Sequence, residues 1–129
     1  MILAGGQRAW LGEPIPDNVE DGILLACEIA AMDLSGTDLV VLSACETGLG
    51  EITSEGVFGL QRAFKKARVQ TLVMSLWKVH DAATSLMMRT FYKNLLDGKS
   101  KRDAFAMAQQ TVKEKYENPY YWASFIMLD

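Results

Sequence analysis

Two residue types in this chain could carry out nucleophilic catalysis, cysteine through its thiol and histidine through its imidazole. The sequence contains two cysteines and one histidine. Cys45 follows an apolar run and precedes Glu46-Thr-Gly-Leu-Gly50, whose glycines let the backbone turn sharply. A thiol at such a turn, near the start of a helix, has its thiolate stabilised by unpaired amides and the helix dipole. Cys45 is therefore a candidate nucleophile, and the alternative is a small buried residue at a strand end.

A thiol nucleophile needs a base, which is usually an imidazole. His80 follows the next apolar run, and neighbouring strands lie about 4.8 Å apart, so its ring could meet Cys45 at one end of a sheet. Such a dyad requires the sulfur and a ring nitrogen within about 4 Å of each other, or a bridging water. The alternative is that His80 is a solvated residue near a helix N-cap. Cys27 lies among alanines in a predicted helix, where we expect it to pack.

Other ligand-binding patterns are missing from the sequence. The cysteines and the histidine do not have the spacing of zinc ligands. Gly48 and Gly50 would need a third glycine at Thr53 to form a dinucleotide fingerprint, and no lysine follows for a phosphate-binding loop. We therefore expect neither a metal nor a cofactor.

Composition describes one packed domain over residues 1–129. The chain is 50% hydrophobic and 22% charged, with a formal net charge of −3. This charge provides no cationic field for nucleic acid or anionic lipid, and the apolar runs are shorter than the roughly 18 residues of a membrane span. Two cysteines in such a composition indicate reduced thiols, so we expect a cytoplasmic protein.

The elements that would position Cys45 and His80 are short strands alternating with helices. Residues 1–20 are expected to be an irregular loop segment because glycines and prolines recur there, and residues 21–129 form the α/β part. The patterns predict strands over 39–44, 70–77 and 120–128, and helices over 25–33, 54–66, 81–97 and 100–117. Asp81 is the expected N-cap of the third helix, Ser100 with Asp103 resembles a capping box for the fourth, and Asn118-Pro119 ends it.

This order of elements is typical of a parallel α/β sheet with right-handed crossovers. Ligands and catalytic groups gather outside the carboxyl ends of such strands, which here are Ser43–Gly50 and Ser75–Asp81. Doubly wound domains usually have about five or six strands. Three strands therefore make half a sheet, with a hydrophobic edge beside residues 39–44.

The stretch Leu39-Val-Val-Leu-Ser-Ala-Cys-Glu-Thr-Gly-Leu-Gly50 resembles the CHAT family, caspase-like cysteine peptidases of bacteria and archaea that are commonly joined to tetratricopeptide repeats. Further segments match in the family's order and spacing, so the resemblance covers nearly the whole chain. They are Asp21–Leu24, Glu28-Ile29, Glu55–Phe64, Ser75–Val79, Asp81–Thr84, Phe91-Tyr92 with Leu95, Ala104–Gln109 and Tyr121–Phe125.

The resemblance implies the C-terminal portion of a caspase-like fold, a parallel sheet flanked by helices. Cys45 matches the catalytic nucleophile, and its backbone N–H would contribute to an oxyanion hole. Ser75, Trp77 and Asp81 would lie along the substrate-binding wall. The implied partner is a polypeptide substrate or another protein, such as a tetratricopeptide-repeat region.

One departure from the family concerns the general base. In this family the catalytic histidine, in a His-Gly pair, ends the strand before the cysteine strand, upstream of anything that matches Met1. His80 stands where the family has an acidic or amide residue, so it does not inherit that role. We therefore expect part of a cysteine endopeptidase domain that is inactive alone. The alternative is a non-catalytic interaction module or a truncated remnant, and the sequence leaves open whether this chain is an enzyme.

Overall fold

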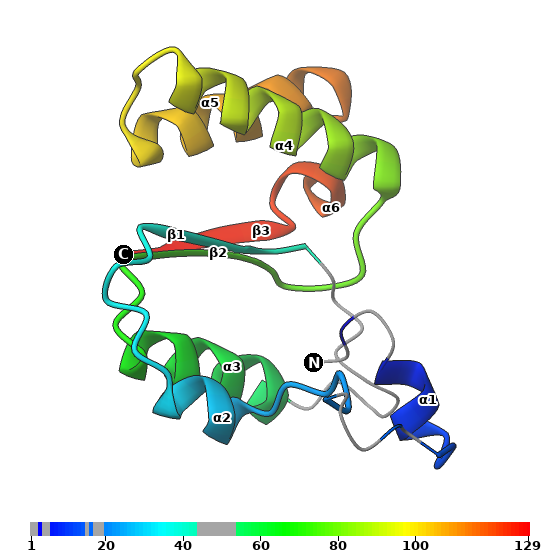
Figure 1. Cartoon of the computed structure of the whole chain (residues 1–129). Coiled ribbons are helices and arrows are strands. Elements are labelled where there is room, and N and C mark those ends of the chain that lie inside the picture. Colours follow the sequence, from blue (N-terminus) through cyan, green and yellow to red (C-terminus); the bar gives the residue numbers. More distant parts are fainter. Residues whose placement is uncertain (1–2, 4–5, 15, 17–19, 44–53) are drawn as a thin grey trace. The chain divides into compact units, whose positions relative to one another are not determined.

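Helices and strands alternate along the chain much as the periodicities predict. The computed structural model describes residues 3, 6–14, 16, 20–43 and 54–129, and the side chains of 54–58 lie outside this description. The elements are α1 (Gly6–Trp10), α2 (Ala26–Ala31), β1 (Leu39–Leu42), α3 (Ser54–Lys66), β2 (Thr71–Ser75), α4 (Asp81–Leu96), α5 (Lys101–Lys115), α6 (Pro119–Trp122) and β3 (Phe125–Leu128) (Figure 1). They fall into two units, Met1–Asp38 with Glu46–Gln70 and Leu39–Cys45 with Thr71–Asp129.

The first unit contains α1, α2 and α3, of which α2 and α3 pack against each other. At the start of α2, the Leu25 backbone N–H donates to the Glu28 carboxylate at 2.7 Å, which satisfies an amide that the helix leaves unpaired. The chain leaves α3 through Arg68, whose φ of 70° is the left-handed conformation typical of a helix end. The buried apolar side chains of this unit are Ile29, Leu60, Ala63, Phe64, Ala67 and Val69.

The second unit is built on a three-stranded sheet in the order β1-β2-β3. β1 runs parallel to β2, with Val41 opposite Val73, and β3 runs antiparallel to β2, with Phe125 opposite Ser75. All five residues of β2 are buried, as expected for a strand with neighbours on both sides. The four residues of β1 are only half-buried. Among the described residues no strand pairs with the outer side of β1.

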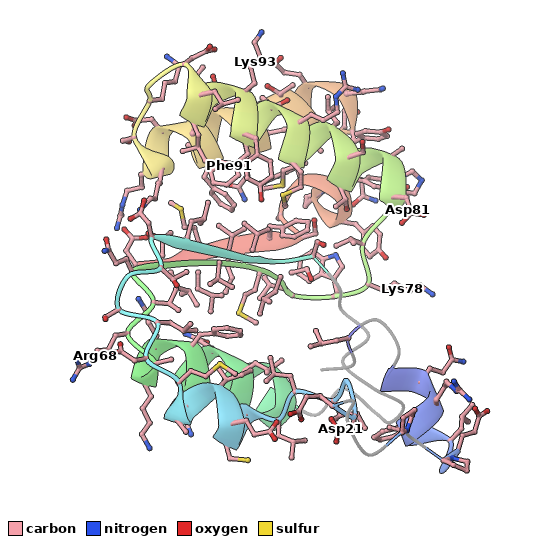
Figure 2. All side chains as sticks on the ribbon, in the orientation of Figure 1. Asp21, Arg68, Lys78, Asp81, Phe91 and Lys93 are labelled. Atoms are coloured by element: carbon pink, nitrogen blue, oxygen red, sulfur yellow. The ribbon has the colours of Figure 1, made fainter. Side chains whose placement is uncertain are left out.

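Helices α4 and α5 form a hairpin that covers one face of this sheet (Figure 1). Phe91 of α4 is fully buried and lies between this helix and the sheet (Figure 2). Its ring meets Phe105 of α5 edge to face at a centroid distance of 6.0 Å, which is a favoured aromatic geometry. The core of this unit consists of Val73, Ala83, Met87, Phe91, Ala104, Phe105, Ala108, Val112 and Phe125.

The direction of β3 corrects the predicted all-parallel sheet, and the fold class is mixed α/β with a small sheet. The cause lies in the helices between β2 and β3, which have 16 and 15 residues. At 1.5 Å per residue they are nearly equal in length, so α4 carries the chain along the sheet and α5 brings it back. The chain therefore re-enters at the end where β2 finished and must run the opposite way.

Two short helices also differ from the sequence prediction. Gly6–Trp10 form α1 within the segment expected to be irregular, because Gly6 and Gly12 (φ +72°) bound these residues without interrupting them. Pro119–Trp122 form α6 where a strand was predicted from residue 120. The Asn118 side chain accepts a hydrogen bond from the Tyr120 N–H at 2.9 Å, and proline at the first helical position favours a helix start.

Candidate functional site

The candidate site lies where β1 and β2 end at the same edge of the sheet. Leu42 is the register partner of Met74, so the segments that follow both parallel strands start side by side. Ligands bind at this edge of open α/β sheets. Cys45 follows Leu42 by three positions and lies outside the described residues, so its role stays a prediction. Trp77 follows Met74 by the same number of positions.

The three predicted substrate-contacting residues differ in exposure. Ser75 is the last residue of β2 and only 6% exposed. Trp77 is half-buried on the segment that joins β2 to α4. Asp81 is exposed at the start of α4, and Figure 2 shows it on the same side of the unit as Lys78. Trp77 and Asp81 are thus the more accessible members of this set.

The indole of Trp77 is turned toward the C-terminal part of the second unit. Its Nε1–H donates to the Tyr120 carbonyl at 3.1 Å. The two rings stack with centroids 6.1 Å apart and an interplanar angle of 22°, an offset arrangement that aromatic pairs favour. Trp77 therefore has a structural partner, and any substrate contact would use the rest of its ring.

His80 is the N-cap of α4, a position the sequence assigned to Asp81. Its Nδ1 accepts a hydrogen bond from the Ala83 backbone N–H at 3.4 Å. The prediction that Asp81 is the N-cap is wrong because Asp81 is already the first residue of α4. A carboxylate in the first turn of a helix is stabilised by the helix dipole and not by a capping hydrogen bond. An accepting Nδ1 assigns the proton of the neutral ring to Nε2. A base acting through Nδ1 would give up the cap.

Two tyrosines surround the exposed ring of His80. Tyr121 meets it edge to face at a centroid distance of 5.3 Å, and Tyr116 lies 6.1 Å away. The segment Leu76–His80 is thus in contact with residues about forty positions later in the chain. The sequence analysis assigned no site to these tyrosines. Asn118-Pro119 was the signal that could have found the helix carrying Tyr121, as an N-cap followed by proline at the first helical position.

Cys27 corrects a second prediction, since it is an exposed free thiol on α2 and not a packed residue. The helix has only six residues, and Ile29 is its buried position. Among the described residues no group of three acidic, histidine or cysteine side chains could hold a metal ion. No helix of the described part is long and apolar enough to cross a membrane.

Known proteins resemble this chain over most of its length. The model of the CHAT domain family matches residues 3–129. Tetratricopeptide repeat protein 28 of Homo sapiens is 31% identical over 121 residues, or 91% of this chain and 5% of that protein. Its Mus musculus counterpart is 32% identical over 108 residues, or 82% and 4%. The chain thus spans about a twentieth of these relatives.

Both relatives are animal proteins, so they give no support to the bacterial or archaeal source that the resemblance suggested. No solved structure matches the chain. The family match covers every described element of both units, from α1 to β3. This chain belongs to the CHAT domain family.

Proposed function

We propose that this chain is the C-terminal part of a CHAT-type cysteine endopeptidase domain with a caspase-like fold. In this proposal Cys45 is the nucleophile, and the histidine that acts as general base lies outside these 129 residues. The observation that carries the proposal is the family match over residues 3–129, which includes the segment containing Cys45. The parallel register of β1 and β2 supports it, because their following segments start at one sheet edge.

The open side of β1 also supports a contribution from other polypeptide. β1 has the apolar sequence Leu-Val-Val-Leu, yet all four residues are only half-buried. An exposed hydrophobic strand edge is a template for pairing with a further strand. A strand that ends in a His-Gly pair would complete the sheet there and bring an imidazole to the edge where β1 ends. His80 does not replace that imidazole in this proposal, because its Nδ1 caps α4.

The mechanism explains why the chain alone should not cleave peptides. An ordinary thiol, with a pKa of about 8.5, is only a few per cent thiolate at pH 7. Without an imidazolium, nothing positioned by the protein would protonate the departing amine. Cys45 could still react with a small alkylating reagent, because displacement of iodide requires no such protonation.

Alkylation and peptide cleavage together test this proposal. Iodoacetamide should modify both cysteines of the chain, with the exposed Cys27 as an internal reference for an accessible thiol, and peptide mass spectrometry would give both rates. A peptide library should remain intact with the chain alone. It should be cleaved when the chain is joined to an upstream segment that encodes a strand ending in His-Gly, and Cys45→Ala should abolish that cleavage.

Two results would contradict the proposal. Robust turnover by the 129-residue chain alone would mean that the base lies within it. A Cys45→Ala variant of the extended protein that still cleaves peptides would remove Cys45 from the mechanism. In the first case His80→Ala would show whether that base is His80, with helical content by circular dichroism as the control for its role in capping α4.

A second candidate is a non-catalytic interaction module, favoured by the names of both relatives, which are tetratricopeptide repeat proteins. In this case the partner would be a tetratricopeptide-repeat region of the same or another polypeptide. Calorimetric titration with such a region should then show binding that Cys45→Ala leaves unchanged, while no extended form cleaves peptides. For both candidates we propose a cytoplasmic protein, because the cysteines are few and Cys27 is a free thiol.

A further inference from the structure

The segment between β2 and α4, residues 76–80, is irregular but tied at three points to residues 120–124. The Leu76 N–H donates to the Ser124 carbonyl at 2.8 Å. The Trp77 indole N–H donates to the Tyr120 carbonyl at 3.1 Å, and the Tyr120 hydroxyl donates to the Lys78 carbonyl at 2.6 Å. Tyr120 therefore bonds this segment with both its backbone and its side chain.

These bonds attach the residues just after β2 to the C-terminal part of the second unit. Trp77 and Lys78 follow the end of β2, where the regular ladder of backbone hydrogen bonds has stopped. The contact from the Tyr120 hydroxyl to the Lys78 carbonyl falls within the normal range for a hydroxyl donor. Together with the stacking of the Tyr120 and Trp77 rings, it sets the path of the backbone at residues 77 and 78.

Hydrogen bonds at both ends of α6 hold the helix that carries Tyr120. Asn118 caps the helix through the Tyr120 N–H at 2.9 Å. On the other side, the Gln109 side chain of α5 donates to the carbonyls of Trp122 and Phe125, each at 3.3 Å. The anchor is thus fixed to α5 and to β3, while the segment that it holds has no secondary structure of its own.

The exposure of Tyr120 argues against a role in core packing. Its relative accessibility is 46%, against 1% for Phe125 five residues later. A half-exposed tyrosine buries little apolar area, so it adds little to the stability of the core. Its hydroxyl, which donates to a distant backbone carbonyl, instead orients the segment that carries this carbonyl. The segment that it orients carries Trp77 and leads to Asp81, two of the residues expected along the substrate-binding wall.

We propose that Tyr120 is a positioning residue that determines substrate selectivity by holding residues 76–80 as one wall of the peptide-binding site. The inference rests on the proposed function and adds to it that this wall faces the substrate residue before the cleaved bond. Tyr120 touches neither the substrate nor the nucleophile in this proposal. It acts through the Lys78 carbonyl and the Trp77 ring, so its loss should change selectivity and leave the reactivity of the thiol unaltered.

Covalent labelling tests this inference with the 129-residue chain as it is. The probes are peptidyl chloromethyl ketones that differ only in the side chain next to the ketone. The Cys45 sulfur displaces chloride from the methylene carbon, forming a thioether, and the thiol proton passes to the buffer. Each labelling rate at Cys45, measured by mass spectrometry, is divided by the iodoacetamide rate at the same thiol, which removes any change in nucleophilicity.

Tyr120→Phe removes only the hydroxyl. The preference for the best peptide over the worst should fall about five-fold, the loss expected for one neutral hydrogen bond, with the iodoacetamide rate unchanged. Tyr92→Phe is the matched control, because Tyr92 is 44% exposed on α4 of the same unit, and it should alter neither rate. Amide hydrogen exchange should also become faster at residues 76–80 in Tyr120→Phe and not in Tyr92→Phe.

The possible failures separate the two proposals. A wild-type chain that labels at Cys45 with no preference among the peptides contradicts the proposed function and this inference together. A wild-type preference that Tyr120→Phe retains in full contradicts only the role of Tyr120. Faster exchange at residues 76–80 with an unchanged preference would mean that Tyr120 holds the segment without shaping a binding wall, which also overturns the inference.

Discussion

The two parallel strands of the second unit are alike in sequence and different in environment. β1 reads Leu-Val-Val-Leu and β2 reads Thr-Leu-Val-Met-Ser, and both lack the alternation of a half-exposed strand. Every residue of β2 is buried, whereas every residue of β1 is half-buried. β2 has a hydrogen-bonded strand on each side, and β1 has one on a single side among the described residues.

This difference shows that an apolar run without alternation does not by itself determine how deeply a strand is buried. An apolar run without alternation is typical of a strand covered on both faces and flanked on both edges. β2 meets that expectation within the described chain, and β1 does not. The apolar sequence of β1 and its partial exposure agree with the proposal that further polypeptide pairs with this strand. Differences in amide protection and packing between β1 and β2 can be measured.

The largest expected difference concerns hydrogen exchange. Amide protons of β2 should exchange about a thousand-fold more slowly than the β1 amides that point away from β2, because an unpaired edge amide needs no cooperative unfolding to reach solvent. Exchange detected by NMR at several protein concentrations measures this ratio. Equal protection of the two strands would contradict the open edge, and protection that rises with concentration would identify a second chain that covers it.

Next in size is a matched pair of core substitutions. Val73 and Val41 are register partners that both contact the core under α4 and α5, but Val73 is 0% exposed while Val41 is half-buried. Val73→Ala should lower the free energy of unfolding by about 2 kcal/mol and Val41→Ala by about 1 kcal/mol. Urea denaturation of the three proteins checks this order. Equal losses would mean that Val41 is as fully packed as Val73.

A smaller effect is expected from the start of α5, which covers the face shared by both strands. The Ser100 hydroxyl accepts a hydrogen bond from the Asp103 N–H at 3.1 Å, so the predicted cap is confirmed. Ser100→Ala should cost about 1 kcal/mol and raise exchange at Val73 as well as in α5. The control is Ser85→Ala on the exposed side of α4, expected to change stability by at most about 0.5 kcal/mol. A loss as large for Ser85→Ala would contradict the role of the cap.

The smallest effect lies in the turn that leads into β1. Hydrogen bonds from the Ser35 hydroxyl and then from its backbone N–H hold the pKa of Asp33 below its ordinary value of 3.8. Because the folded pKa is the lower one, the stability from this carboxylate is present above pH 3.8 and is lost as the pH falls through the folded value. Ser35→Ala should raise the pKa of Asp33 toward 3.8 in a carbon-13 NMR titration.

Two comparisons control this last prediction. Ser85→Ala should leave the Asp33 titration unchanged, because Ser85 lies in the other unit. Exchange rates in β2 should not respond to Ser35→Ala, since Asp33 is a fully exposed residue and exposed interactions contribute little to global stability. An Asp33 pKa that does not move would mean that the Ser35 hydroxyl is not its main partner.

Local patterns predicted most of the elements because their causes are local. The apolar spacing of α3 matched its observed limits at Ser54 and Lys66, and Ser100 opened α5 as its type and position indicated. The errors occurred where competing local signals had similar strength. At residues 120–122 aromatic side chains favour a strand, but Asn118 and Pro119 start a helix and prevail.

The candidate site was predictable in part. The sequence placed His80 between a strand and a helix, which is where it lies, but it placed Trp77 in the strand, whereas β2 ends at Ser75. It did not predict that His80 caps α4, since the N-cap preference favours Asp81, and it assigned no site to Tyr120. The bonds between residues 76–80 and 120–124 join positions more than forty apart, and no spacing rule reports such pairs.

The sequence by itself determined the family, the identity of the candidate nucleophile and the apolar character of both parallel strands, because these depend on residue type and order. Only the tertiary structure decided the direction of β3, the half-buried state of β1 and the contacts of Tyr120. These depend on how a hairpin of two nearly equal helices returns the chain to one end of the sheet. That return brings Tyr120 to the Lys78 carbonyl, a contact that follows from the path of the chain in space.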